Sequence, residues 1–140
     1  MLRVILLAIF VLGLTPPAAF AATCSGADPA VVSATYRLAG SDGGANRYRL
    51  TIRVVNVGST GQASNVLQFV DIYEHGTKLD AKGIPPLGAG QSYSVTYMYK
   101  RATDAGNGTA RFAFQLDMRQ PAGVSGQNCG AANDRFRLVL

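Results

Sequence analysis

Apolar residues alternate with polar ones along most of this chain, and clusters of Gly, Asn, Asp and Pro interrupt the alternation. A period of two is typical of a β-strand with one buried face, because successive side chains point to opposite sides of the sheet. The pattern recurs in seven segments, and no segment shows a helical period. These segments are residues 32–38, 47–54, 66–74, 77–80, 93–100, 110–117 and 135–140. Seven such segments in roughly a hundred residues predict an all-β fold, a single immunoglobulin-like antiparallel β-sandwich.

Three of these segments carry a further expectation about their place in the sheets. Residues 66–74 are apolar on both faces, which predicts a central strand. Residues 77–80 are expected to form a short edge strand, and Pro85 and Pro86 exclude a central strand directly after it. The alternation slips after Val54, which predicts a bulge or a strand end near Asn56-Val57-Gly58.

The first 21 residues have the order of a secretory signal peptide. Arg3 precedes an apolar run over residues 4–14, and the small residues of Ala19-Phe20-Ala21 follow, which predicts cleavage after Ala21. The apolar run is about half as long as a membrane-spanning helix requires. We therefore expect residues 22–140 to form one exported domain, periplasmic or secreted to the cell surface, with no transmembrane segment after cleavage. An uncleaved anchor and a lipid attached at Cys24 are the alternatives.

The charge and the cysteines narrow the class of protein further. The formal net charge is +5, and removal of Arg3 with the signal peptide lowers it by one. This mild excess in an exported chain does not indicate a nucleic-acid partner. Cys24 and Cys129 are the only cysteines, and in an oxidising compartment they are expected to form one disulfide. Their spacing is not that of a redox centre, so the predicted role of the disulfide is structural.

Several motifs together resemble the CARDB family, the cell-adhesion-related domains of bacterial exported proteins. The resemblance covers residues 31–133, and it rests on Asn56-Val57-Gly58, on Ile84–Ser92 before the strand 93–99, on Asp104-Ala105-Gly106 and on Asn133-Asp134. It implies a β-sandwich with a role in adhesion or protein interaction. The acidic, asparagine-rich end of the family is reduced here to Asn128-Cys129-Gly130 and Asn133-Asp134. We therefore predict no metal site.

No residues of this chain predict catalysis. His75 is the only histidine and is expected to lie in a turn pointing into solvent, without a second histidine to complete a zinc site. No serine lies in a Gly-x-Ser-x-Gly motif. Asp71 and Glu74 are three residues apart, so on a strand they would face opposite sides and could not act as paired carboxylates. We predict a protein that is not an enzyme and that uses no cofactor.

Arginines form the one surface pattern with a definite shape. Arg47, Arg49 and Arg53 share the outward side of the second predicted strand, and Arg37 is expected on its neighbour. If these two strands pair, the four arginines form a face that can hold carboxylates or phosphates through two hydrogen bonds each. The alternative is a solvated face, or an edge that charge protects from aggregation.

The sequence leaves several functions open. The first hypothesis is an exported, non-enzymatic interaction module of the adhesion type, whose partner is an envelope or extracellular protein or a surface polysaccharide. The alternative is binding of an anionic glycan or lipid headgroup through Arg37, Arg47, Arg49 and Arg53. A small protease inhibitor with a protruding loop over residues 83–90 is a less favoured third hypothesis. The oligomeric state is not predicted.

Overall fold

The computed structural model describes residues 25–103, 109–119 and 126–140, and it is an all-β structure in which every strand pairing is antiparallel. The described residues form seven strands and one short 3-10 helix. They are β1 (Pro29–Asp42), β2 (Ala45–Asn56), β3 (Gln68–Glu74), β4 (Thr77–Ile84), β5 (Ser92–Ala102), β6 (Arg111–Met118), η1 (Ala131–Asn133) and β7 (Arg135–Val139). The predicted seven-stranded β-sandwich is therefore confirmed.

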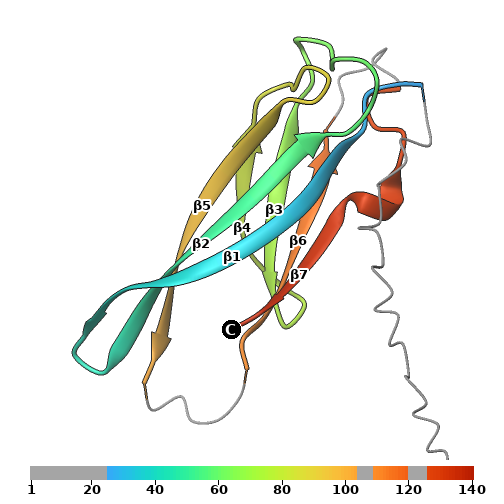
Figure 1. Cartoon of the computed structure of the whole chain (residues 1–140). Helices are drawn as coiled ribbons and strands as arrows, with labels where there is room; N and C mark the ends of the chain where they lie inside the picture. The colour runs from blue at the N-terminus through green and yellow to red at the C-terminus, as the bar shows by residue number, and fades with distance from the viewer. Residues whose placement is uncertain (1–24, 104–108, 120–125) are drawn as a thin grey trace, which may run out of the picture.

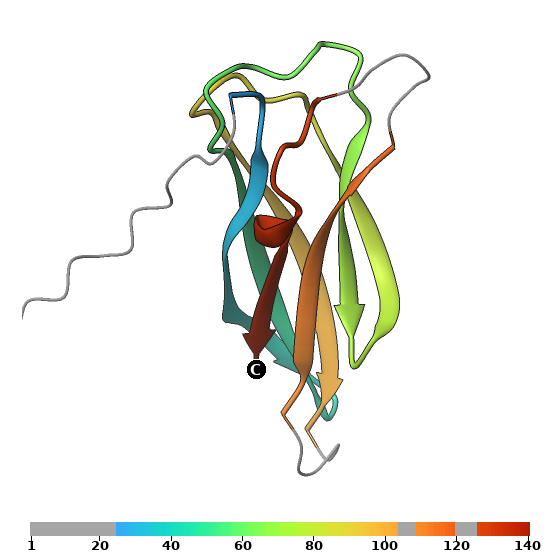
Figure 2. The same ribbon diagram turned by 90° about the vertical axis from the view of Figure 1, so that its right-hand side faces the viewer.

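The strands form two sheets that pack face to face (Figures 1 and 2). The three-stranded sheet has the order β1-β2-β5, and the four-stranded sheet has the order β4-β3-β6-β7. β3 is a central strand, as its two apolar faces predict. β4 is an edge strand, as expected, but it continues to Ile84 because the first proline comes only at residue 85. β2 ends at Asn56, which agrees with the predicted strand end.

The core lies between the two sheets and is built from every second residue of the paired strands. Leu50, Ile52 and Val54 of β2 are fully buried, and they face a second set from the other sheet. That set comprises Val70, Ile72, Phe112, Phe114 and Leu116. Burial of each such side chain contributes about 1.5–3 kcal/mol relative to an exposed position. Because successive side chains of a strand point to opposite faces, the residues that alternate with these core residues lie on the outer faces of the two sheets.

One buried side chain, that of Asn56, connects three chain segments at the end of the sandwich. Its Oδ1 accepts hydrogen bonds from the backbone N–H groups of Asp28 at 2.9 Å and of Gly58 at 3.0 Å. Its Nδ2 donates to the backbone carbonyls of Thr60 and Leu87, each at 2.9 Å. The side chain is fully buried, and all of its usual donor and acceptor positions are used.

The two motifs of the sequence, Asn56-Val57-Gly58 and the loop before β5, therefore meet in space. The backbone of Asn56 also exchanges hydrogen bonds with this loop: its N–H donates to the carbonyl of Gln91, and its carbonyl accepts from Gly90, both at 2.9 Å. Gly58 packs so closely against the chain before β1 that a Cβ would lie 2.2 Å from the carbonyl oxygen of Gly26. A side chain at position 58 would force these backbones apart, which explains the glycine.

Two predictions fall partly or wholly outside the described residues. The predicted signal peptide, residues 1–21, lies outside them, and so does Cys24, so the Cys24–Cys129 disulfide stays a prediction. Cys129 lies against the start of the domain, since its N–H donates to the carbonyl of Ala27 at 3.0 Å and its Sγ adjoins Gly26. In the part of the chain that the structure describes, no helix has the length and apolar character needed to span a membrane.

Replacement of Asn56 by alanine is expected to lower the free energy of unfolding by about 3 kcal/mol or more. The change leaves the N–H groups of Asp28 and Gly58 without their acceptor, and an unpaired buried polar group costs about 1–3 kcal/mol. The carbonyl of Thr60 also loses its donor from Asn56, whereas the carbonyl of Leu87 still accepts from the Gln62 N–H. Asn46→Ala is the matched control, because Asn46 lies in the same strand and its side chain hydrogen-bonds to the side chains of Ser41 and Tyr48 rather than to buried backbone groups. Urea denaturation of both variants gives the comparison. Equal small losses would contradict the role of Asn56.

Candidate functional site

The four predicted arginines lie on the outer face of the three-stranded sheet. Arg47, Arg49 and Arg53 point outward because Tyr48, Leu50, Ile52 and Val54 of the same strand face the other sheet. The pairing of β1 with β2 places Arg37 directly opposite Arg49. All four arginines are exposed. The structure thus brings these residues together on one face, which we call the arginine face.

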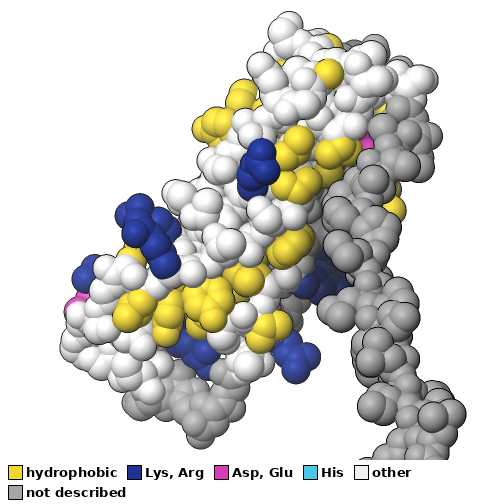
Figure 3. Space-filling model, viewed as in Figure 1, with side chains coloured by type: hydrophobic (Ala, Val, Ile, Leu, Met, Phe, Trp, Pro, Cys, Tyr) yellow, Lys and Arg dark blue, Asp and Glu magenta, His cyan; other side chains and the backbone are white. Residues whose placement is uncertain are grey.

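The third strand adds residues that the sequence pattern did not indicate. β5 pairs with β2 so that Lys100 lies opposite Arg47 and Met98 lies opposite Arg49. Side chains with hydroxyl groups fill most of the remaining outward positions of the sheet. They are Ser33, Thr35, Thr51, Ser92, Ser94 and Thr96. Figure 3 shows Lys and Arg side chains spaced along this side of the molecule with uncharged surface between them.

The charges of the arginine face are only partly compensated. Asp42 pairs with Arg47 at 3.2 Å and with Lys100 at 3.6 Å, and Arg53 donates to the hydroxyl of Ser92 at 3.3 Å. Arg37 and Arg49 form no ion pair with any of the described residues. Like charges directly opposite each other on neighbouring strands destabilise a sheet. An anion bound between Arg37 and Arg49 would relieve this repulsion.

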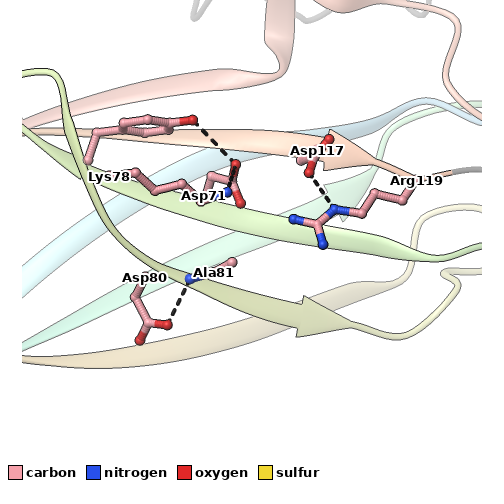
Figure 4. A network of polar contacts seen from close by, with 7 residues as sticks. Asp71, Lys78, Asp80, Ala81, Asp117 and Arg119 are labelled. Atoms are coloured by element: carbon pink, nitrogen blue, oxygen red, sulfur yellow. Dashed lines mark hydrogen bonds and ion pairs between the residues drawn. The ribbon is translucent and has the colours of Figure 1, made fainter.

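The carboxylates of the four-stranded sheet are engaged by other cations. Figure 4 shows Asp71 with Lys78, and Asp117 with Arg119. Asp71 accepts a hydrogen bond from Lys78 at 2.6 Å and one from the Tyr73 hydroxyl at 3.3 Å. Asp80 pairs with Lys82 at 2.7 Å. The hydrogen bond from Lys82 holds the pKa of Asp80 below its ordinary value.

Asp117 is engaged in the same way on the outer side of β6. It pairs with Arg119 at 2.8 Å, and the Arg119 guanidinium lies 4.3 Å from the centroid of the Phe69 ring. The Asp117 carboxylate in turn raises the pKa of Arg119. Among the described residues, Asp71, Asp80 and Asp117 of the four-stranded sheet are thus each paired with a lysine or arginine close to them.

The asparagine-rich end of the chain is joined to the start of β1. Asp28 is buried, and its two carboxylate oxygens accept hydrogen bonds from the Gly130 N–H at 3.1 Å and from the Asn133 side chain at 3.0 Å. Asp134 accepts from Asn128 at 2.9 Å. No group of three or more His, Cys, Asp or Glu side chains that could hold a metal ion occurs among the described residues. This end of the molecule is a hydrogen-bonded closure of the sandwich.

His75 and the tyrosines of β5 have separate positions. His75 is exposed at the turn between β3 and β4, as predicted, with a φ of 47° followed by Gly76 at 86°, the pair of positive values of a type I′ turn. Tyr97 and Tyr99 face inward and pack against the core. The Tyr99 hydroxyl donates to Glu74 at 2.5 Å. Burial, together with this carboxylate, raises the pKa of Tyr99 to about 12.

Comparison with known proteins bears on the fold. No family model matches the sequence, and no curated protein matches it. Among solved structures, the chain resembles the CARDB domain of a Pyrococcus furiosus protein that was crystallised in complex with di-metal ions. The two share 16% identity with a TM-score of 0.51, and the match covers 84% of this chain and 96% of that domain. The chain therefore has a CARDB-like fold, as the motifs of the sequence predict.

The raised pKa of Tyr99 predicts a loss of stability at alkaline pH. Because the folded state holds the phenol in its protonated form, the stabilisation is complete below pH 10 and is lost as the pH rises toward about 12. Tyr99→Phe removes the hydrogen bond to Glu74, so it should cost about 1 kcal/mol at pH 8. The same variant should lose less stability than the wild type between pH 10 and pH 12. Some loss should remain in the variant, because burial also raises the pKa of Tyr97. Parallel urea denaturation at pH 8 and pH 11 tests this, and equal alkaline losses would contradict it.

Asp134→Asn is expected to stabilise the protein at neutral pH. Burial is the main cause that raises the pKa of Asp134, and the nearby Asp28 carboxylate adds to it. Charged Asp134 therefore weakens the folded state at pH 7, whereas near pH 3 it is protonated and this cost disappears. The asparagine keeps the oxygen that accepts from Asn128. The gain should stay below about 1 kcal/mol because the side chain is only half-buried. A melting temperature that rises at pH 7 and is unchanged at pH 3 is the expected result, and a fall at pH 7 would contradict it.

Proposed function

We propose that this protein is an exported, non-enzymatic interaction module of the adhesion type that binds an anionic glycan through its arginine face. The CARDB-like fold supports an adhesion-type role. The observation that carries the choice of ligand is the cross-strand pair of Arg37 and Arg49, exposed and without a carboxylate partner among the described residues.

The spacing of the arginines suits an extended, repeating anion. Residues two apart on a strand lie about 7 Å from each other, because each residue advances the strand by about 3.4 Å. Arg47, Arg49 and Arg53 are therefore spread along one line on β2, and Arg37 widens that line toward β1. A guanidinium can hold a carboxylate or phosphate with two hydrogen bonds. A polysaccharide with acidic groups along its length could engage several of these arginines at once.

The rest of the face also favours a sugar over a protein partner. Protein interfaces are centred on an apolar patch with few charges. The middle of the arginine face instead holds Thr51 and Thr96, which lie opposite each other on β2 and β5. Met98 is an exposed large apolar side chain of this face, and Val55, opposite Ser92, is half-buried at its end. Hydroxyl groups can donate and accept hydrogen bonds with sugar hydroxyls. An anionic lipid headgroup is also negatively charged, but it lacks the row of acidic groups that a polysaccharide carries along its length.

The proposal does not include metal-mediated binding, although the Pyrococcus furiosus domain was crystallised with di-metal ions. Ca²⁺ requires six to eight oxygen ligands. The nearest comparable donors here are Asp28, Asn128, Asn133 and Asp134, and Asp28 and Asp134 already accept hydrogen bonds from neighbouring groups. These residues do not fit a di-metal site, so no step of the proposed binding involves one.

The test is binding of the mature chain to immobilised polygalacturonate, with neutral dextran as the reference surface. We expect affinity that decreases as salt rises, because exposed charges are screened. The double variant Arg37→Ser/Arg49→Ser should bind at least tenfold more weakly. The control Lys82→Ser/Arg119→Ser removes the same charge from the other sheet and should bind within about twofold of the wild type.

Three outcomes of this experiment decide against the proposal. Equal binding by the wild type and the Arg37→Ser/Arg49→Ser variant would exclude the arginine face as the site. Equal losses in that variant and the control would show that only net charge matters. A chain that ignores polygalacturonate and binds phosphatidylglycerol vesicles through the same two arginines would assign the face to a lipid headgroup.

A further inference from the structure

A second group of arginines lies on the opposite side of the molecule, on the outer face of the four-stranded sheet. Arg111 lies at the start of β6, and Arg135 and Arg137 lie on the edge strand β7. All three point outward because Phe112, Phe136 and Leu138, which alternate with them, pack on the core side. The pairing of β6 with β7 brings these residues together although they are more than twenty positions apart in the sequence.

These arginines border a hollow in the surface. Its volume is about 260 Å³, and it is lined by His75, Gly76, Arg111, Phe112, Ala113, Arg135 and Arg137. Ala113 lies opposite Arg137, so a small side chain occupies the middle position of β6 on this face. The larger Arg111 and Gln115 occupy the outward positions on either side of it. The hollow lies over the small Ala113 side chain, between the larger side chains of Arg111 and Gln115.

The turn between β3 and β4 closes one end of the hollow in a fixed conformation. His75 and Gly76 both have positive φ values, as the type I′ turn requires, and the His75 N–H donates to the carbonyl of Arg111 at 3.0 Å. This hydrogen bond ties the imidazole-bearing residue to the strand that carries Arg111. Four side chains with N–H donors therefore border one hollow from three different elements.

No carboxylate of the described residues pairs with the arginines of this hollow. Arg111, Arg135 and Arg137 form no ion pair within the ranges that the structure describes. The described carboxylates of the same sheet are used elsewhere: Asp71 by Lys78, Asp80 by Lys82 and Asp117 by Arg119. Glu74, the neighbour of His75, faces the core side and accepts from Tyr99. Three adjacent guanidinium groups without a counter-charge repel one another, and a bound anion would remove that repulsion.

We propose that this hollow binds the phosphate group of a phosphorylated ligand. Phosphate carries up to two negative charges and several acceptor oxygens, so it can accept from more than one guanidinium at the same time. A carboxylate has one charge and two oxygens, and it would leave part of the arginine cluster unpaired. The hollow is compact, whereas the arginine face is extended, so the two surfaces suit different anions. This inference concerns a different surface and does not depend on the proposed glycan binding.

The test is an NMR titration of the ¹⁵N-labelled mature chain with sodium phosphate at constant ionic strength. We expect saturable shifts of the amide signals of residues 75–76, 111–113 and 135–137. Sodium acetate at equal ionic strength should bind with an apparent affinity at least tenfold weaker. The double variant Arg135→Ser/Arg137→Ser should weaken phosphate binding at least tenfold, whereas Lys82→Ser/Arg119→Ser should stay within twofold of the wild type.

The outcomes separate this proposal from simple charge effects. Equal responses to phosphate and acetate, or equal losses in the two double variants, would show non-specific attraction and overturn it. Unchanged phosphate binding in a folded Arg135→Ser/Arg137→Ser variant, with folding judged from the dispersion of its own spectrum, would also overturn it. Loss of polygalacturonate binding leaves the phosphate titration unaffected, so each proposal fails separately.

Discussion

The hydrogen bonds of Asn56 are the constraint on which one whole end of this sandwich depends. A β-sandwich needs its connecting loops to hold the two sheets together where the strands end, and loops can do so only if their buried backbone groups find partners. Asn56 supplies both acceptor and donor bonds to three such segments, from Asp28 before β1 to Leu87 before β5. Gly58 lets the first of these segments approach, because any side chain there would collide with the backbone of Gly26. The strands on either side then take their register from this fixed end, and that register decides which side chains reach the outer faces.

Much of the fold follows from alternation alone, for a simple physical reason. A residue such as Ile52 must be buried and its neighbour Arg53 must be solvated, and only an extended chain satisfies both at every second position. The central position of β3 was predictable in the same way. The length of β4 was less so, because its residues alternate weakly and its place is set by pairing with β3 rather than by its own pattern. The motif around Asn56 marked a strand end, but local pattern cannot identify the hydrogen-bond partners of its side chain, since they lie up to 31 residues away.

The two candidate sites also differ in how far the local sequence pattern could predict them. The arginines of β2 share one strand, so their common face could be predicted from spacing, and Arg37 required only the assumption that neighbouring strands pair. Lys100 could not be added without the register between β2 and β5. The hollow at Arg111, Arg135 and Arg137 was beyond local reasoning, because it needs the pairing of β6 with β7 and the position of the β3–β4 turn. Sequence shows which residues are outward on each strand, and the order of strands decides which of them become neighbours.

The distribution of charge is the feature of the fold on which both proposals rest. Folding by itself gives no reason to place arginines beside one another without carboxylates, because repulsion within such a cluster lowers stability. In the described part of the chain, the pairing is uneven: the lysines of β4 and Arg119 have carboxylate partners, whereas Arg37 and Arg49 on one outer face and three arginines on the other do not. Since the two outer faces of a sandwich are separated by its core, one ligand group cannot satisfy both clusters. The two clusters therefore act as independent surfaces, and a variant in one leaves the geometry of the other intact. A two-sheet fold can thus present an extended row of arginines on one outer face and a compact, arginine-lined hollow on the other.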